Sequence, residues 1–431
     1  MATQRYHFGM PQSPVQLSRV NPDQINLSDP EFWKAPRDHR ESVFASLRKE
    51  APVKFFPEIE LMNFPKGPGY WALTKHEDIW HASRNPDLFQ SGKGTNIPDL
   101  TIELNEFFGS MISMDDPKHV RLRTIVSKGF TPKEIARIEE YVKIKARTVV
   151  DTVIEKFGDS EFDFVENIAA PFPLQIICEM MGIPQSDEKQ ILDWTNVILG
   201  AGDPDFGGTL ENLINVALEI FAYAQALGED RLKTPQDDLT SIMMHAEVDG
   251  ERMSPQEFGS FFILLVVAGN ETTRNAISHG MLELTRLQDE RAKWFGNFEA
   301  NTKTAVEEIV RWSSPVIHFR RTATRDTEIR GVKIKQGEKI VMWYNSANRD
   351  EEVYENPYIF DVTRAPAPGQ VGFGAGGPHF CLGANLARRE LGVMFNEIYT
   401  RMPNLQITGE PAYLQSNFIN GIKRMACRIN P

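Results

Sequence analysis

The strongest constraint on the fold is a long central region, residues 116–312, in which apolar residues recur three and four positions apart. This spacing places apolar side chains on one face of a helix, so the region predicts a series of packed helices. Breaks between them are predicted at Thr131-Pro132, at Gly182-Ile183-Pro184, at Gly202-Asp203-Pro204 and at Gly207-Gly208. The longest apolar run, residues 261–268, is far shorter than the roughly 20 residues that cross a bilayer. No transmembrane segment is therefore expected.

Two regions with β character flank the helical one. Short strands are predicted at Val53–Phe56 and Tyr70–Thr74, and a second β region at Val316–Met342 with a turn at Gln336-Gly337. An isolated hairpin is only marginally stable, so the N-terminal strands are expected to join the later ones in one sheet. Residues 31–431 are therefore predicted to form a single domain, mainly α with small β-sheets. Residues 1–30, rich in Pro, Ser, Asn and Asp, are predicted to be a loosely ordered N-terminal arm.

Charge and cysteine content exclude several classes of protein. The formal net charge of -12 argues against a nucleic-acid partner, because phosphate binding needs concentrated positive charge. The three cysteines, Cys178, Cys381 and Cys427, form no CxxC pair, which argues against a disulfide framework and a zinc site. Cys178 and Cys427 are expected to be core or terminal residues. With no apolar signal at the N-terminus, the pattern favours a cytoplasmic enzyme.

Cys381 stands between a glycine-rich loop and a predicted helix. Glycines at 372, 374, 376 and 377 let the backbone approach a bulky group closely. The spacing of Leu382, Leu386 and Leu391 predicts that a helix begins directly after the cysteine. Backbone N–H groups at a helix start favour a thiolate, so the pKa of the Cys381 thiol is expected to be lowered. A buried structural cysteine is the alternative interpretation of a lone Cys.

Gly377, His379, Cys381 and Gly383 fall at the spacing of the cysteine signature of the cytochrome P450 superfamily, which this chain resembles. Phe373 lies one residue further from the cysteine than is usual in that signature. The resemblance implies the fold of that family, a triangular helical prism that encloses haem b. It also implies that Cys381 is the iron ligand, whose electron donation favours O–O cleavage.

The residues Ala268–Thr273, AGNETT, follow the apolar run. A carboxylate such as Glu271 is costly in an apolar helix unless it is solvated. Gly269 weakens the helix, and the Thr272 hydroxyl can hydrogen-bond back to the carbonyl of Ala268. These features predict a locally opened helix that admits water, and a helix end with exposed polar residues is the alternative. The stretch resembles the acid–alcohol motif of the family. The resemblance implies that Ala268 lies against the haem, that Thr272 steadies bound oxygen, and that Glu271 relays solvent protons as a general acid.

Further charged residues match family elements. Glu308 and Arg311 lie three apart on one helical face and match the E-x-x-R element, with Arg364 as its third member. Their implied role is structural. An exposed pair of this kind would contribute under about 1 kcal/mol.

Haem carries two propionates, which need cationic partners. The resemblance implies four such residues, for each of which an ordinary surface position is the alternative. They are His119, Arg123, Arg321 and His379.

Electrons are expected from a separate ferredoxin and its reductase. A docking surface for an acidic carrier is predicted from five basic residues, for which a solvated helix face is the alternative. They are Lys118, Arg121, Lys128, Arg388 and Arg389.

From about Phe32 to the C-terminus, the chain resembles, within this family, the mycobacterial enzymes that ω-hydroxylate methyl-branched lipids, with sterol side-chain oxygenases next. The implied reaction is insertion of one atom of O2 into a C–H bond of an apolar substrate. Candidate pocket residues are Ile97, Phe107, Phe108, Ile198, Ile263, Val267, Val316 and Phe319. The alternatives are another hydrophobic substrate such as a terpenoid, a peroxide-driven enzyme, a haem-binding sensor or carrier without oxygen activation, and a plain helical interaction protein.

Overall fold

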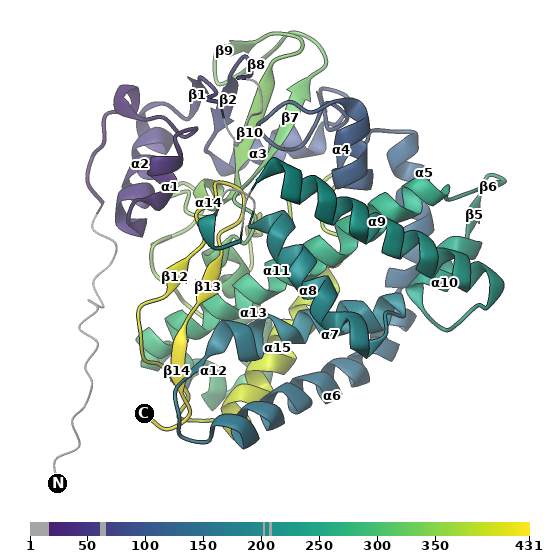
Figure 1. The fold of residues 1–431 in the computed structure, drawn as a ribbon. Coiled ribbons are helices and arrows are strands. Elements are labelled where there is room, and N and C mark those ends of the chain that lie inside the picture. The colour runs from purple at the N-terminus through teal and green to yellow at the C-terminus, as the bar shows by residue number, and fades with distance from the viewer. Residues whose placement is uncertain (1–16, 61–65, 201–202, 207–208) are drawn as a thin grey trace.

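The region predicted to be helical is built of helices in the computed structural model, which describes residues 17–60, 66–200, 203–206 and 209–431. The helices gather around α11, and the largest sheet lies to one side of them (Figure 1). The longer helices are α2 (Arg37–Glu50), α3 (His76–Arg84), α4 (Ile102–Gly109), α5 (Lys118–Ser127), α6 (Pro132–Phe157), α7 (Pro171–Met181), α8 (Glu188–Leu199), α9 (Leu210–Lys233), α11 (Pro255–Arg286), α12 (Gln288–Gly296), α13 (Phe298–Ser313) and α15 (Ala384–Arg401). Shorter ones are α1 (Pro30–Lys34), α10 (Leu239–His245) and α14 (Tyr344–Ala347).

Local sequence explains where these helices begin and end. The hydroxyl of Thr131 accepts a hydrogen bond from the N–H of Glu134, and Pro132 follows it, so the predicted break there is the start of α6. Gly182 ends α7 with a left-handed φ of 70°. Of the other predicted breaks, Gly202 and Gly207-Gly208 lie outside the described residues.

The largest sheet has the strand order β1-β2-β10-β7-β3. Its strands are β1 (Val53–Phe56), β2 (Tyr70–Leu73), β3 (Phe89–Gln90), β7 (His318–Ala323) and β10 (Lys339–Trp343). Because β2 pairs in parallel with β10, the prediction that the N-terminal strands join the later ones is confirmed.

Short strand pairs complete the β structure. The predicted turn at Gln336-Gly337 is present, and a second turn at Arg330-Gly331 joins β8 (Thr327–Ile329) to β9 (Val332–Ile334). The remaining strands are β4 (Phe162–Asp163), β5 (Glu247–Val248), β6 (Glu251–Arg252), β11 (Gln406–Ile407), β12 (Ala412–Tyr413), β13 (Ile422–Arg424) and β14 (Ala426–Arg428).

The described part of the N-terminal arm packs against α2. The backbone N–H groups of Ser18 and Val20 donate to the hydroxyls of Ser42 (3.1 Å) and Ser46 (2.9 Å). Leu27 is fully buried. This part of the arm is therefore packed, contrary to the loose order predicted for it, because its backbone and an apolar side chain both find partners on α2 and the neighbouring core.

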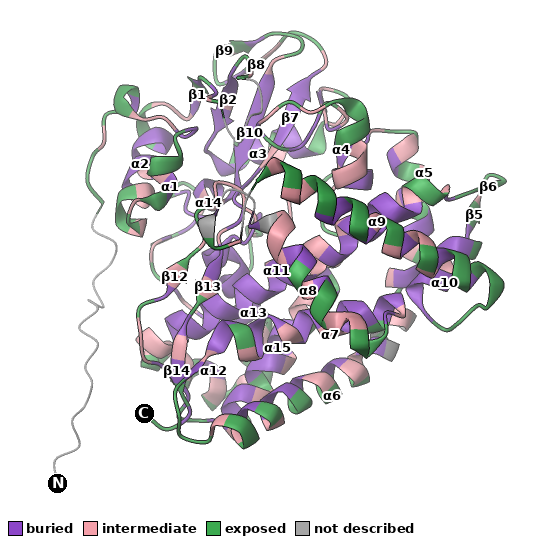
Figure 2. Ribbon diagram, in the orientation of Figure 1, coloured by how far each residue is buried: buried purple, intermediate pink, exposed green. Residues whose placement is uncertain are grey.

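Helix α11 is the centre of the main core and is buried along most of its length (Figures 1 and 2). It packs against α4, α7, α9, α13 and α15. Within the part of the chain that the structure describes, none of the helices combines the length and the apolarity that crossing a bilayer requires. The positions of α11 and α15 decide where the candidate site lies.

Candidate active site

The loop that precedes Cys381 folds back on itself and rests on α3. The N–H of Cys381 donates to the carbonyl of Phe373 (2.9 Å). Gly374, Gly376 and Gly377 have φ values of 91°, 74° and 78°, a region that side chains disfavour. A Cβ on Gly377 would lie 2.2 Å from the carbonyl oxygen of Ser83. Both the dihedral angles and the close approach therefore require glycine.

Cys381 is an exposed residue, although the surrounding protein desolvates its thiol. Burial raises its pKa, against the opposing effects of the N–H groups of Gly383 and Ala384 and the guanidinium groups of Arg123 and Arg388. The prediction of a lowered pKa is therefore wrong for the protein alone, because desolvation outweighs the helix start. A coordinated metal ion deprotonates a thiol outright, so the sulfur suits an iron ligand.

Phe373 lies close to the cysteine despite its shift by one residue. Its carbonyl binds the Cys381 N–H, and the guanidinium carbon of Arg388 stands 4.5 Å over its ring. Arg388 also lowers the pKa of the Cys381 thiol. The ring thus packs beside a cation that acts on the sulfur.

One short stretch in the middle of α11 has open surface, although most of the helix is buried. Ala268 is exposed, and Val267 and Thr272 are half-buried. Ala268 and Thr272 lie one turn apart, and the Thr272 hydroxyl donates to the Ala268 carbonyl (2.8 Å). This open face is where a planar cofactor could rest against α11. The helix itself is continuous from Pro255 to Arg286, so the predicted local opening is wrong.

Glu271 does not share this open face. Its side chain is buried and forms an ion pair with Arg274, one turn along α11. The Asn275 amide donates to the other carboxylate oxygen (3.4 Å). The carboxylate is thus held by two polar residues of the same helix, which gives it the partners that a buried charge needs.

Two histidines and two arginines form a cationic cluster near the cysteine. The rings of His119 and His379 lie 4.3 Å apart. Burial, followed by the charges of Arg321, His119 and Arg123, lowers the pKa of His379 to about 2. His119 Nε2 and His379 Nδ1 are buried, and the described residues offer them no hydrogen-bond partner.

Arg321 is the buried arginine of this cluster. It is 4% exposed, and the one hydrogen bond of its guanidinium group to the described residues goes to the carbonyl of Arg320 (2.7 Å). Burial lowers its pKa. A buried cluster with surplus positive charge is costly unless an anion neutralises it. The two carboxylates of a haem fit this requirement, so the chemistry of the donor set matches the cofactor.

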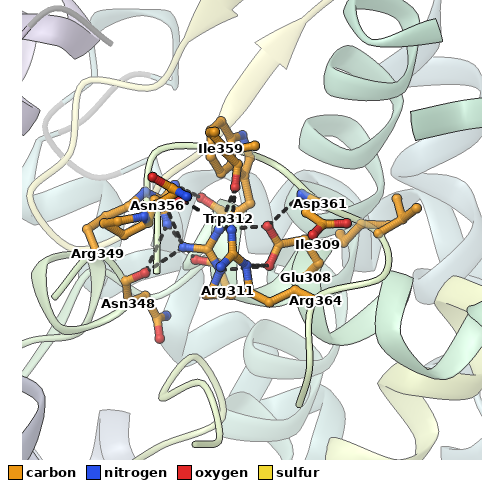
Figure 3. A network of polar contacts seen from close by, with 12 residues as sticks. Glu308, Ile309, Arg311, Trp312, Asn348, Arg349, Asn356, Ile359, Asp361 and Arg364 are labelled. Atoms are coloured by element: carbon orange, nitrogen blue, oxygen red, sulfur yellow. Dashed lines mark hydrogen bonds and ion pairs between the residues drawn. The ribbon is translucent and has the colours of Figure 1, made fainter. Parts of the chain in front are cut away.

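Glu308, Arg311 and Arg364 are in direct contact (Figure 3). The Arg311 Nε and Nη2 atoms each lie 2.7 Å from a Glu308 oxygen, and the Arg364 Nε lies 3.0 Å from one of them. The N–H of Asp361 donates to Glu308, and Arg311 also donates to the carbonyl of Asn348. Because this network ties α13 to the segment before the cysteine loop, it can hold that loop in place.

Four of the five basic residues predicted for electron-carrier docking are paired with carboxylates of this chain. The partners are Glu106 for Lys118, Glu257 for Arg121, Glu307 for Arg388 and Glu139 for Arg389. Lys128 instead donates to the carbonyl of Glu247 (3.3 Å). The surface is therefore less positive than the sequence predicts, because neighbouring helices supply acidic partners.

The predicted pocket residues fall into three groups. Phe107 on α4, Ile263 and Val267 on α11 and Ile198 on α8 belong to the main core cluster, and Phe108 contacts Phe107, with ring centroids 5.2 Å apart. Val316 and Phe319 belong to the sheet side, where Phe319 contacts Phe418 (5.6 Å). Ile97 packs apart from both, in a third cluster with Leu27 and Trp343.

Sequence reasoning missed two aromatic residues of this region. Phe221 on α9 contacts Phe107, with ring centroids 5.5 Å apart. Phe418 contacts Phe319. No local pattern singled them out, since each lies far along the chain from its partner.

Three comparisons agree with this geometry. Residues 301–401 match the cytochrome P450 family. The chain is 54% identical over 401 residues to the methyl-branched lipid omega-hydroxylase of Mycobacterium bovis (93% of this chain, 94% of that one) and 40% identical over 423 residues to the steroid C26-monooxygenase of Rhodococcus jostii (96% and 87%). The structure of Mycobacterium marinum cytochrome P450 CYP268A2 in complex with pseudoionone superposes with a TM-score of 0.90 and 40% identity, covering 95% of this chain and 100% of that one. The similarity spans nearly the whole length of these relatives and includes the cysteine loop, so this chain belongs to the cytochrome P450 family of haem monooxygenases.

Proposed function

We propose that the enzyme uses haem b, ligated by Cys381, and O2 to hydroxylate the terminal carbon of methyl-branched lipids or sterol side chains. The observation that carries the substrate class is the 54% identity, over 93% of the chain, to a methyl-branched lipid omega-hydroxylase. The steroid C26-monooxygenase at 40% identity supports the sterol side chain as the next candidate.

Three groups of residues would hold the cofactor. Cys381 would bind the iron, Ala268 and Thr272 would contact the cofactor from α11, and the cluster around His379 would bind the propionates. When bound, the haem supplies the oxygen chemistry. Gly383 contributes its N–H to the sulfur, which favours the thiolate.

The residues of the chain bind the substrate and move protons. Apolar side chains around Phe107, Ile263 and Val267 would bind an alkyl chain by removing it from water, at about 25 cal/mol per Å² of buried apolar surface. Thr272, on the open face of α11, would present its hydroxyl beside the reacting oxygen. Glu271 would supply solvent protons to that side as a general acid.

Electrons would come from a ferredoxin and its reductase. Lys128 is the predicted docking residue that has no carboxylate partner among the described ion pairs, so it is the best candidate contact for an acidic carrier. The compartment that we propose is the cytoplasm, in which the three free thiols of the chain would stay reduced.

The first test is a spectral titration of the purified haem enzyme. Phytanic acid, a branched isoprenoid alcohol and cholestenone are each added, and the low-to-high-spin change that accompanies loss of the iron's water is followed. Tight binding of phytanic acid with a terminal-hydroxyl product supports the proposal. Spin changes and products that arise with cholestenone alone would move the assignment to sterols.

Cys381→Ser tests the iron ligand, and Cys178→Ser is its matched control. The Cys381→Ser variant should lose the thiolate-type absorption of the reduced carbon monoxide complex, whereas Cys178→Ser, at a buried cysteine of α7, should keep it. Retention of that absorption without Cys381 would exclude the residue as ligand.

A terpenoid hydroxylase is the second candidate. It is favoured by the 40% identical relative whose structure was solved in complex with pseudoionone. Adding pseudoionone to the same titration separates this candidate from the first. Thr272→Ala separates both from a peroxide-driven enzyme or a haem carrier, since O2 consumption should become uncoupled from product only in an O2-using monooxygenase.

A further inference from the structure

A narrow cleft beside Glu271 lies between α8, α11 and the segment that carries β12 and β13. Its polar lining residues are Glu271, Arg274 and Asn275 of α11, Asn196 of α8 and Lys423 of β13. The open volume of about 10 Å³ is enough for about one water molecule. The cleft thus places a polar space, large enough for one water molecule, beside the Glu271 carboxylate.

Arg274 contacts two of the other polar residues that line this cleft. One of its guanidinium nitrogens pairs with Glu271 and donates to the Asn196 side-chain oxygen (2.9 Å). The guanidinium therefore connects the carboxylate on α11 to the neighbouring helix α8. Asn275 holds the second carboxylate oxygen, and its own side-chain oxygen accepts the N–H of Ile422 (3.0 Å).

Two buried polar atoms next to this network have no partner among the described residues. They are Arg274 Nε and Asn270 Oδ1. Arg274 is 6% exposed and Asn270 is fully buried, with its amide donating to the Thr195 hydroxyl of α8 (3.3 Å). An unpartnered buried donor or acceptor costs about 1–3 kcal/mol, and an ordered water removes that cost. Arg274 Nε therefore indicates bound water at the cleft that Arg274 lines, and Asn270 Oδ1 indicates bound water at the residue before Glu271.

Lys423, which also lines the cleft, is paired with two carboxylates. The Lys423 ammonium pairs with Asp203 (3.0 Å) and with Asp205 (2.8 Å). Asp203 also accepts the N–H of Gln415 (3.0 Å), which ties the segment before β13 to the residues between α8 and α9. These contacts hold the two walls of the cleft together.

We propose that this cleft is the route by which solvent protons reach Glu271, and that Arg274 is the positioning residue that keeps the carboxylate in the wall of the cleft. The inference rests on the proposed role of Glu271. A proton from bulk water passes along the cleft water to a Glu271 oxygen and leaves that oxygen toward the Thr272 hydroxyl. The carboxylate is thereby regenerated and the water regains its proton from solvent, so no other reactant is needed.

The variants Arg274→Met, Arg274→Lys and Asn196→Leu test the route. Arg274→Met should lower product formation about tenfold and raise the solvent isotope effect, a fraction of the roughly hundredfold loss expected when Glu271→Gln removes the general acid itself. Arg274→Lys should recover most of the rate because it keeps a cation at the position. Asn196→Leu should act like Arg274→Met, since it fills the cleft and removes the arginine's anchor.

Arg286→Met is the matched control, because Arg286 pairs with Glu283 at the same spacing on the same helix (3.3 Å). It should leave rate and isotope effect unchanged. The carbon monoxide spectrum and the substrate spin change should be normal in every variant. In the double variant Glu271→Gln/Arg274→Met, the second change should add no further loss, as for residues acting in one path.

A crystal structure of the haem enzyme gives a readout independent of turnover. Ordered water should bind Arg274 Nε or Asn270 Oδ1 in the wild type and be absent from Asn196→Leu. A dry cleft, or Arg274→Met with an unaltered rate and isotope effect while Glu271→Gln is impaired, overturns the route alone. A fully active Glu271→Gln overturns the proposed role of Glu271 as well.

Discussion

Glu390 tests how the burial of a carboxyl group changes its pKa and the stability of this protein. It lies on α15 with 2% exposure, and its hydrogen-bond partner is the Thr273 side chain on α11. Burial raises the pKa of its carboxyl to about 8, against the lowering effect of Thr273. The folded protein therefore holds the Glu390 proton more tightly than the unfolded chain does.

The sign of the effect follows from this difference. Between the ordinary value of 4.5 and about 8, unfolding releases the proton, so the free energy of unfolding falls as the pH rises and levels off above about 8. At about 1.4 kcal/mol per pH unit, the whole contribution is at most about 5 kcal/mol. Glu390→Gln keeps the shape and removes the titration. Its stability relative to the wild type should rise by several kcal/mol from pH 5 to pH 9.

Denaturant unfolding followed by circular dichroism at pH 5, 7 and 9 measures this difference, because all other titrating groups cancel between the two proteins. Glu397→Gln is the control, since Glu397 lies on the same helix but is paired with Arg147 (4.0 Å). Infrared spectra should also show a protonated carboxyl band at neutral pH that Glu390→Gln lacks. A gap between variant and wild type that stays constant with pH would refute the argument from burial.

Three further perturbations follow from the site. Glu308→Gln leaves the buried Arg311 without its carboxylate and should cost about 3–5 kcal/mol of stability, measured by denaturant unfolding; an unchanged midpoint would contradict the network of Figure 3. Gly377→Ala places a Cβ against the Ser83 carbonyl and should reduce the haem content of the purified protein, read from the ratio of haem to protein absorbance; full haem loading would show that the loop can move. Lys128→Glu should slow reduction by ferredoxin at low salt and lose this effect at high salt, and an equal effect at both would rule out electrostatic docking there.

Local sequence patterns predicted the parts of the fold that depend on neighbours along the chain. The break at Thr131-Pro132 and the end of α7 at Gly182 are confirmed because capping and left-handed turns involve residues within a few positions of one another. Recognition of the cysteine loop succeeded for the same reason. Gly374, Gly376 and Gly377 have positive φ angles, which glycine adopts more readily than any other residue.

Other predictions failed where they depended on distant residues. The pKa of the Cys381 thiol is raised, since burial is supplied by packing from the whole fold. The basic surface is largely paired because Glu139 and Glu257 approach from other helices. Ile97 joins the cluster around Leu27, which the residue spacing does not encode.

The sequence by itself determined the family, the order of helices and strands, and the cysteine that can bind iron. These features depend on residue type and on spacing over a few positions. Only the tertiary structure decided which charges are paired, how Glu271 is held, and that a water-sized cleft opens beside it between α8 and the residues around Lys423. The physical reason is that burial and electrostatic energy depend on distances between segments far apart in the chain, which folding alone brings together.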